Sequence, residues 1–123
     1  MSNNNQPLDF SERLYHFNLF QEEALTSAIY PDKGDNLYYP ALGLAGEAGE
    51  VCEKIKKIMR DQGGEVTLDN RIEIKKELGD VLWYIAALAY ELDLELNNVA
   101  ESVLIKLADR KDRDVLAGSG DNR

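Results

Sequence analysis

The sequence predicts an all-α protein in which four helices form a single domain. Apolar residues recur at three- and four-residue intervals along most of the chain, and proline and glycine stand between these stretches. No internal repeat, low-complexity block or Pro/Ser-rich linker divides the 123 residues. A chain of this length is one domain's worth and buries roughly two-thirds of its unfolded surface. We therefore expect a four-helix bundle-type protomer over residues 1–123, with residues 1–8 and 114–123 as flexible tails.

The first expected helix begins after Asp9 and ends at Pro31. Asp9 and Glu12 have the spacing of a capping box, and apolar residues follow at helical intervals. Residues 31–39 contain proline, glycine, asparagine and two aspartates, which predicts a loop. The chain's one histidine, His16, falls in this helix, where we expect a structural or surface role.

Two longer helices are expected in the middle of the chain. Pro40 suits the first turn of a second helix, which runs to about residue 61 before Gly63 and Gly64 stop it. Asp69 is expected to cap a third helix, whose apolar positions continue to Leu92.

The fourth expected helix runs from about residue 97 to about residue 113. Four apolar residues at helical spacing support it: Val99, Val103, Leu104 and Leu107. The closing segment, residues 118–123, is rich in glycine and polar residues, and we expect no helix there.

The third helix is apolar almost all round between residues 81 and 90, where the sequence reads VLWYIAALAY. Such a helix is buried on most of its sides, and three partner helices of one chain supply limited cover. We therefore expect self-association through this helix, as a homodimer or homotetramer. The alternative is a central helix in a well-packed monomer.

Composition and charge exclude several classes of function. Fourteen Lys and Arg against 23 Asp and Glu give a net charge of −9, which argues against nucleic-acid binding and attraction to anionic membranes. No apolar run approaches the ~20 residues of a membrane span, and the N-terminus has no signal-peptide pattern. A single cysteine, Cys52, allows no intramolecular disulfide, so we expect a reducing, cytoplasmic location.

The residue inventory also limits the chemistry. One histidine and one cysteine exclude multi-histidine metal sites and zinc knuckles, and neither GxxxxGK[ST] nor GxGxxG occurs. At about 100° per residue, the apolar arc of the second helix covers seven residues, Leu44, Ala45, Ala48, Val51, Cys52, Ile55 and Met59. We therefore expect Cys52 to fill space in the core. Carboxylates are the abundant chemical group that remains.

Four of these carboxylates form two pairs with i, i+3 spacing, Glu47 with Glu50 and Glu77 with Asp80. Glu47 and Glu77 each lie about 20° outside the apolar arc of their helix. If those arcs pack antiparallel, all four acids line one edge of the seam. Clustered acids either hold protons or bind a cation, and an all-oxygen donor set favours Mg²⁺ or Mn²⁺. The alternative is two solvated acidic faces without a metal.

The acidic pairs and their surroundings resemble the MazG-like nucleoside triphosphate pyrophosphohydrolases of the all-α NTP pyrophosphatase superfamily. Its motif is ExxE, a spacer and ExxD, which here is Glu47-Ala-Gly-Glu50 and Glu77-Leu-Gly-Asp80 with 26 residues between them. Similar sequences extend over residues 20–31 and 106–110 and the closing GSGDNR.

The resemblance implies a helical protomer that assembles at least as a dimer and binds Mg²⁺. It implies that water attacks the α-phosphorus of a (deoxy)nucleoside triphosphate and releases the monophosphate and pyrophosphate. Glu47, Glu50, Glu77 and Asp80 correspond to the metal ligands, and Glu50 is our candidate for orienting or deprotonating the water. The tail is expected to fold over the bound triphosphate.

Substrate contacts are expected from two further groups of residues. The candidates for the phosphates are cations near the second acidic residue and along the fourth helix: Lys54, Lys106, Arg110 and Arg113. Stacking on the base and hydrogen bonds to it could come from Phe17, Gln21, Trp83 and Tyr84. Relatives commonly have Asn where this chain has Val103, so a polar contact is lost there. For each candidate, the alternative is an ordinary charged surface or apolar core position.

Two other classes of protein are alternatives to a MazG-like hydrolase. A non-catalytic acidic helical protein, regulatory or antitoxin-like, could keep the fold without turnover, although an intact set of four acids favours the enzyme. A Nudix hydrolase would give the same products, but it requires the REUxEExGU box (U apolar) and surrounding strands, which this sequence lacks.

Overall fold

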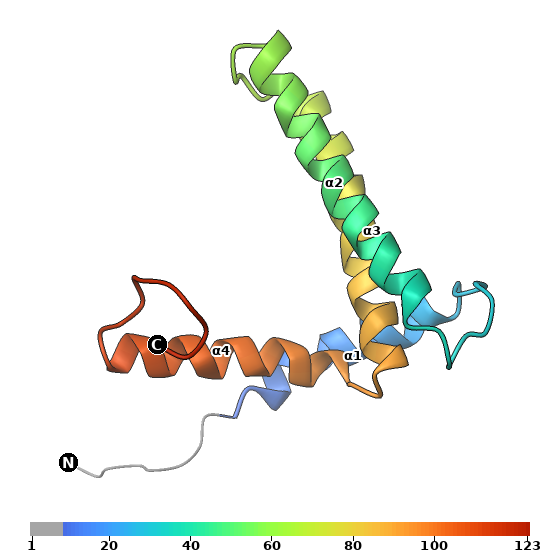
Figure 1. Cartoon of the computed structure of the whole chain (residues 1–123), viewed down its shortest axis with the longest axis vertical. Coiled ribbons are helices and arrows are strands. Elements are labelled where there is room, and N and C mark those ends of the chain that lie inside the picture. Colours follow the sequence, from blue (N-terminus) through green and yellow to red (C-terminus); the bar gives the residue numbers. More distant parts are fainter. Residues whose placement is uncertain (1–8) are drawn as a thin grey trace.

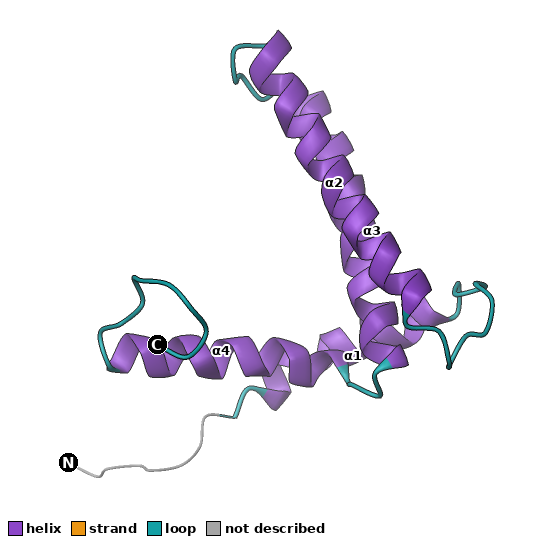
Figure 2. Ribbon diagram, in the orientation of Figure 1, coloured by secondary structure: helices purple, strands orange, loops and turns teal. Residues whose placement is uncertain are grey.

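The computed structural model describes residues 9–123, and the expected tail at residues 1–8 lies outside the described residues. Four α-helices follow one another: α1 (Ser11–Leu25), α2 (Tyr38–Asp61), α3 (Leu68–Glu91) and α4 (Leu96–Asp112). No strand occurs between residue 9 and the C-terminus (Figure 2), which confirms the all-α prediction. Within the same range, no helix has the length and apolar character needed to cross a membrane.

The helices form two arms that meet at one junction (Figure 1). α2 and α3 pack along each other as a long antiparallel hairpin, while α1 and α4 pack together and against α3. α2 packs against α3 and, in the described chain, against no other helix. The position of α2 therefore depends on its interface with α3.

The buried core lies at the junction of the arms. It contains alanines from α3 together with residues of α1, the following turn and the start of α4: Ala24, Leu25, Ala28, Tyr30, Ala86, Ala87, Ala89 and Leu96. Small side chains on α3 allow α1 to approach it closely. The amide of Gln21 joins three backbone groups there, because Nε2 donates to the carbonyls of Ala86 (3.2 Å) and Leu94 (3.0 Å) and Oε1 accepts from the N–H of Leu96 (3.0 Å).

The first helix is shorter than expected. It ends at Leu25 and not at Pro31, because Thr26 Oγ1 and Ser27 Oγ donate to the carbonyls three residues earlier, at 2.6 and 2.8 Å. Ile29, whose spacing continues the apolar pattern of this helix, lies beyond its end and is 94% exposed. Side-chain hydrogen bonds of Ser and Thr to nearby carbonyls compete with helix continuation.

The expected capping residues of two helices were wrong. Asp9 accepts a hydrogen bond from the N–H of Ser11 (2.9 Å), but α1 has no capping box. α3 is capped by Thr67 and not by Asp69: Thr67 Oγ1 accepts from the N–H of Asn70 (3.2 Å), and Asn70 Oδ1 accepts from the N–H of Thr67 (3.0 Å). Asn in place of Glu or Gln at the third helical position concealed this capping box in the sequence.

The other boundaries agree with expectation to within two residues. α2 begins two residues before Pro40 and ends at Asp61, and the positive φ angles of Gly63 (59°) and Gly64 (82°) carry the chain into the next loop. α4 begins and ends one residue before the expected limits of 97 and 113.

The largest departure concerns the face that α2 turns toward α3. The residues of α2 that are buried or half-buried at helical spacing are Pro40, Gly43, Leu44, Glu47, Val51, Lys54 and Ile58. Most of the expected apolar arc lies exposed beside them: Ala45, Ala48, Cys52, Ile55 and Met59. Cys52 is therefore a surface thiol, and the core role expected for it was wrong. Compared with the expected arc, the packed face is therefore rotated about the axis of α2. This rotation places Glu47 within the helix–helix interface, in the middle of the packed face.

Candidate functional site

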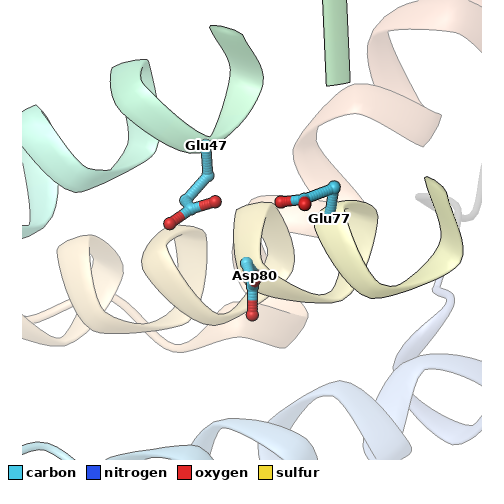
Figure 3. A group of neighbouring side chains, drawn as sticks. All are labelled: Glu47, Glu77 and Asp80. Atoms are coloured by element: carbon cyan, nitrogen blue, oxygen red, sulfur yellow. The ribbon is translucent and has the colours of Figure 1, made fainter. Parts of the chain in front are cut away.

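Three carboxylates meet where α2 packs on α3. Glu47 comes from α2, and Glu77 and Asp80 come from α3 (Figure 3). One carboxylate oxygen from each residue lies within 4.8 Å of the other two. Glu47 and Glu77 are half-buried and Asp80 is exposed. The i, i+3 spacing on α3 and the packed position on α2 bring these acids together.

The acids repel one another in the absence of a cation. Partial burial raises the pKa of the Glu47 carboxyl, and the negative charges of Asp80 and Glu77 raise this pKa further. Burial and nearby like charges both disfavour the ionised carboxylate. A divalent cation would reverse this effect, because it favours the ionised form of each ligand.

Glu50, the fourth expected ligand, lies outside this group. It is exposed on α2, one turn beyond Glu47, and its carboxylate does not fall within the 4.8 Å cluster. Its charge nevertheless contributes to the raised pKa values of both Glu47 and Lys54. The structure therefore brings together three of the four expected acids and leaves Glu50 beside them.

Lys54 is the cation nearest to the cluster among those expected to bind phosphates. Its Nζ lies 3.3 Å from Glu73 Oε2 and 3.7 Å from Glu77 Oε1. The hydrogen bond to Glu73 and the charges of Glu73, Glu77 and Glu50 raise the pKa of the ammonium group. Sequence reasoning missed Glu73, although its i, i+4 spacing from Glu77 places both on one face of α3.

A cavity of about 330 Å³ opens beside the acids. Glu47 and Asp80 line it together with Ser27, Trp83 and Tyr84. Its volume is within the range of small-molecule sites, and two aromatic rings beside two carboxylates could accept a flat, polar ligand. Two of the four residues expected at the base, Trp83 and Tyr84, thus share a cavity with two of the acids.

The other two residues expected at the base lie elsewhere. Phe17 lines a separate apolar hollow with His16, Phe20 and Leu82, and His16 is exposed as expected. The amide of Gln21 is engaged with the three backbone groups at the helix junction. The structure therefore does not bring Phe17 or Gln21 to the acidic cluster.

The expected phosphate-binding cations of α4 contact the C-terminal segment. Lys106 Nζ lies 3.3 Å from Asp121 Oδ1, and Arg110, which is 4% exposed, donates to the Asp121 carbonyl at 2.6 Å. Arg113 pairs with Asp109 at 2.8 Å and donates to the carbonyl of Arg123 at 2.7 Å. Figure 1 shows this segment folded back along α4, on the arm away from the α2–α3 hairpin. Nothing in the sequence pattern indicated this pairing.

Comparison with known proteins agrees with these features. The family model of the MazG nucleotide pyrophosphohydrolase domain matches residues 40–114, a range that contains Glu47, Glu77 and Asp80. The chain is also 50% identical over 113 residues to the Gene 37 protein of Mycobacterium phage L5. The aligned region covers 88% of this chain and 99% of the relative. No solved structure matches the chain. With a family model covering more than half of its length, the chain belongs to the MazG nucleotide pyrophosphohydrolase family.

Proposed function

We propose that the protein hydrolyses (deoxy)nucleoside triphosphates to the monophosphate and pyrophosphate, with Mg²⁺ as its cofactor and Mn²⁺ as a substitute. The observation that carries this proposal is the cluster of Glu47, Glu77 and Asp80 inside a MazG domain. Such an enzyme would control nucleotide pools or remove damaged and non-standard nucleotides.

The donor set fits a hard divalent cation. Glu47, Glu77 and Asp80 offer only carboxylate oxygens, and burial together with the charges of the other two acids raises the pKa of Glu47 in the metal-free chain. These three residues would hold the ion, and Glu50 is the candidate for a fourth ligand. When bound, Mg²⁺ supplies Lewis-acid polarisation of the phosphate oxygens and lowers the pKa of coordinated water.

The chain's own residues would position the reactants. Glu50, exposed one turn from Glu47, would orient the attacking water and accept its proton. The water oxygen forms a bond to the α-phosphorus as the bond from that phosphorus to the bridging oxygen breaks, and pyrophosphate leaves. Lys54, already paired with acids beside the cluster, would turn toward the phosphates and offset their charge.

The remaining substrate contacts follow from the cavity beside the acids. Trp83 and Tyr84 line this cavity, so they would contact the base. Phe17 and Gln21, like Lys106, Arg110 and Arg113 on α4, stay weaker candidates because they lie apart from the cluster in the single chain.

Self-association is part of the proposal. α3 carries a stripe of exposed apolar residues, in which Leu68 is 72%, Ile72 47%, Leu78 53% and Leu82 36% exposed. On α2, Ile55 (48%) and Met59 (63%) are exposed in the same way. Large exposed apolar side chains on two neighbouring helices favour an interaction surface. A second copy packed on the hairpin would cover both stripes in a dimer or tetramer.

The test is the first product formed from a panel of natural and modified nucleotides, with and without Mg²⁺. Pyrophosphate is expected, and Glu50→Gln and Asp80→Asn are expected to abolish its release. Glu65→Gln, in the loop between α2 and α3, is the matched control and keeps full activity. Orthophosphate as the first product would show that another bond is cut. No turnover on any nucleotide would favour the non-catalytic regulatory protein.

A further inference from the structure

Of the four glycines inside α2 and α3, one differs from the rest in its surroundings. A Cβ added at Gly46, Gly49 or Gly79 would meet no atom within 4 Å. A Cβ added at Gly43 would overlap three ring atoms of Tyr84: Cδ1, Cε1 and Cζ. Glycine inside a helix is unfavourable by about 1 kcal/mol relative to alanine. Among these four residues, only Gly43 owes its lack of a side chain to the close approach of another side chain of the described chain.

The place of this contact along the hairpin relates it to the acids. Gly43 lies one turn before Glu47 on α2, and Tyr84 lies one turn after Asp80 on α3. Because the two helices are antiparallel, Gly43 and Tyr84 both lie one turn closer than the acids to the same end of the hairpin. The contact therefore sets how closely α2 and α3 approach beside the cluster.

Tyr84 has two aromatic neighbours besides its contact with Gly43. Its ring lies edge-on to Trp83 at 5.0 Å and tilted against Tyr39 at 6.3 Å, both measured between ring centroids. Tyr39 stacks on Tyr30 at 4.8 Å, and the Tyr30 hydroxyl donates to Glu91 at 2.6 Å. These contacts join the Tyr84 ring to an aromatic cluster, which limits its movement. A side chain at residue 43 would therefore push the two helices apart.

We infer that Gly43 and Tyr84 form a positioning contact that sets the distance between Glu47 and the acids of α3 for metal binding. The inference rests on the proposed metal site. Mg²⁺ requires oxygen ligands at 2.0–2.1 Å in near-octahedral geometry, and binding sites tolerate displacements of only about 0.5 Å. α2 packs against no helix other than α3 in the described chain, so no second helix–helix interface corrects a displaced α2.

The test measures Mn²⁺ affinity of the full chain by electron paramagnetic resonance of the free ion. Gly43→Ala is expected to weaken binding at least tenfold. Gly46→Ala, on the same helix and adjacent to Glu47, is the matched control and keeps the wild-type affinity. Tyr84→Ala removes the obstructing ring, so Gly43→Ala should then add less than a threefold loss in the double variant. A full tenfold loss in that background, or wild-type affinity of Gly43→Ala, would overturn the inference.

Stability provides a second readout and covers the case in which Gly43→Ala fails to fold. Its urea midpoint should fall, and the double variant should regain a midpoint close to that of Tyr84→Ala. A double variant that stays unfolded would also overturn the inference, because the ring would not be the obstacle. Absence of Mn²⁺ binding by the wild-type chain would instead contradict the proposed function.

Discussion

Asp80→Asn is expected to have opposite effects on stability with and without a divalent cation. In the metal-free protein, burial and the charges of Asp80 and Glu77 raise the pKa of Glu47, so the ionised cluster is unfavourable. Replacing Asp80 by a neutral residue of similar shape removes part of this repulsion. The metal-free variant should therefore melt at a higher temperature than the wild type.

The expected effect of the metal is large enough to measure by calorimetry. A ligand at one hundred times its Kd stabilises the folded state by about 2.7 kcal/mol. For 123 residues, an unfolding entropy of about 2.1 cal/mol/K per residue gives about 0.26 kcal/mol/K. Saturating Mg²⁺ or Mn²⁺ should therefore raise the Tm of the wild type by about 10 °C, and that of Asp80→Asn by little.

Asp112→Asn is the matched control, because it removes the same charge at the C-terminal end of α4. Divalent cations also screen the net charge of −9 without a specific site, and Asp112→Asn should keep the full metal response. An equal metal-induced rise in Tm in both variants would refute the assignment of Asp80 as a ligand. A metal-free Asp80→Asn less stable than the wild type would refute the electrostatic reasoning.

Three further predictions concern other parts of the structure. The raised pKa of Glu47 means that this carboxyl binds more proton in the folded chain than in the unfolded chain between pH 4.5 and its folded pKa, so its contribution to metal-free stability should fall as pH rises through that range. Glu47→Gln should lose this contribution in urea titrations at several pH values, and a pH dependence equal to that of the wild type would contradict it. Thr67→Ala should reduce the free energy of unfolding, measured in urea, by about 1 kcal/mol, because it removes the N-terminal cap of α3. An equal loss in the control Asp69→Ala would contradict the assignment of Thr67 as the capping residue. Ile72→Lys should shift the proposed oligomer toward monomer in sedimentation measurements, whereas Glu73→Lys beside it should not. A monomeric wild type would contradict self-association.

The number and type of elements could be predicted because they depend on local patterns. Apolar spacing and the positions of proline and glycine identified four helices, and Gly63 and Gly64 marked the end of α2 correctly. Helix ends were harder to predict where side chains compete with the backbone for hydrogen bonds. Thr26 and Ser27 end α1 by bonding to its last carbonyls, and a helical spacing that continues to Ile29 carries no sign of this.

The candidate site was predicted in part. The i, i+3 spacing was sufficient to place Glu77 and Asp80 together, and the expected antiparallel packing of the two helices, like the resemblance, paired them with Glu47. Local spacing could not determine which face of α2 contacts α3, because an apolar arc packs equally well on its own chain or on another copy. The expected seam therefore contained Ile55, whereas the structure turns Glu47 and Lys54 toward α3 and leaves Ile55 half exposed.

This rotation of α2 connects the proposed metal site with the proposed self-association. Placing Glu47 in the α2–α3 interface brings like charges together there, and it leaves the apolar stripe with Ile55 and Met59 exposed. Both features disfavour the isolated, metal-free chain, since one concentrates repulsion and the other exposes apolar surface. A divalent cation removes the first disadvantage and a second copy removes the second. Because both act on α2, which packs only on α3 among the described helices, each should stabilise the helix position that the other requires.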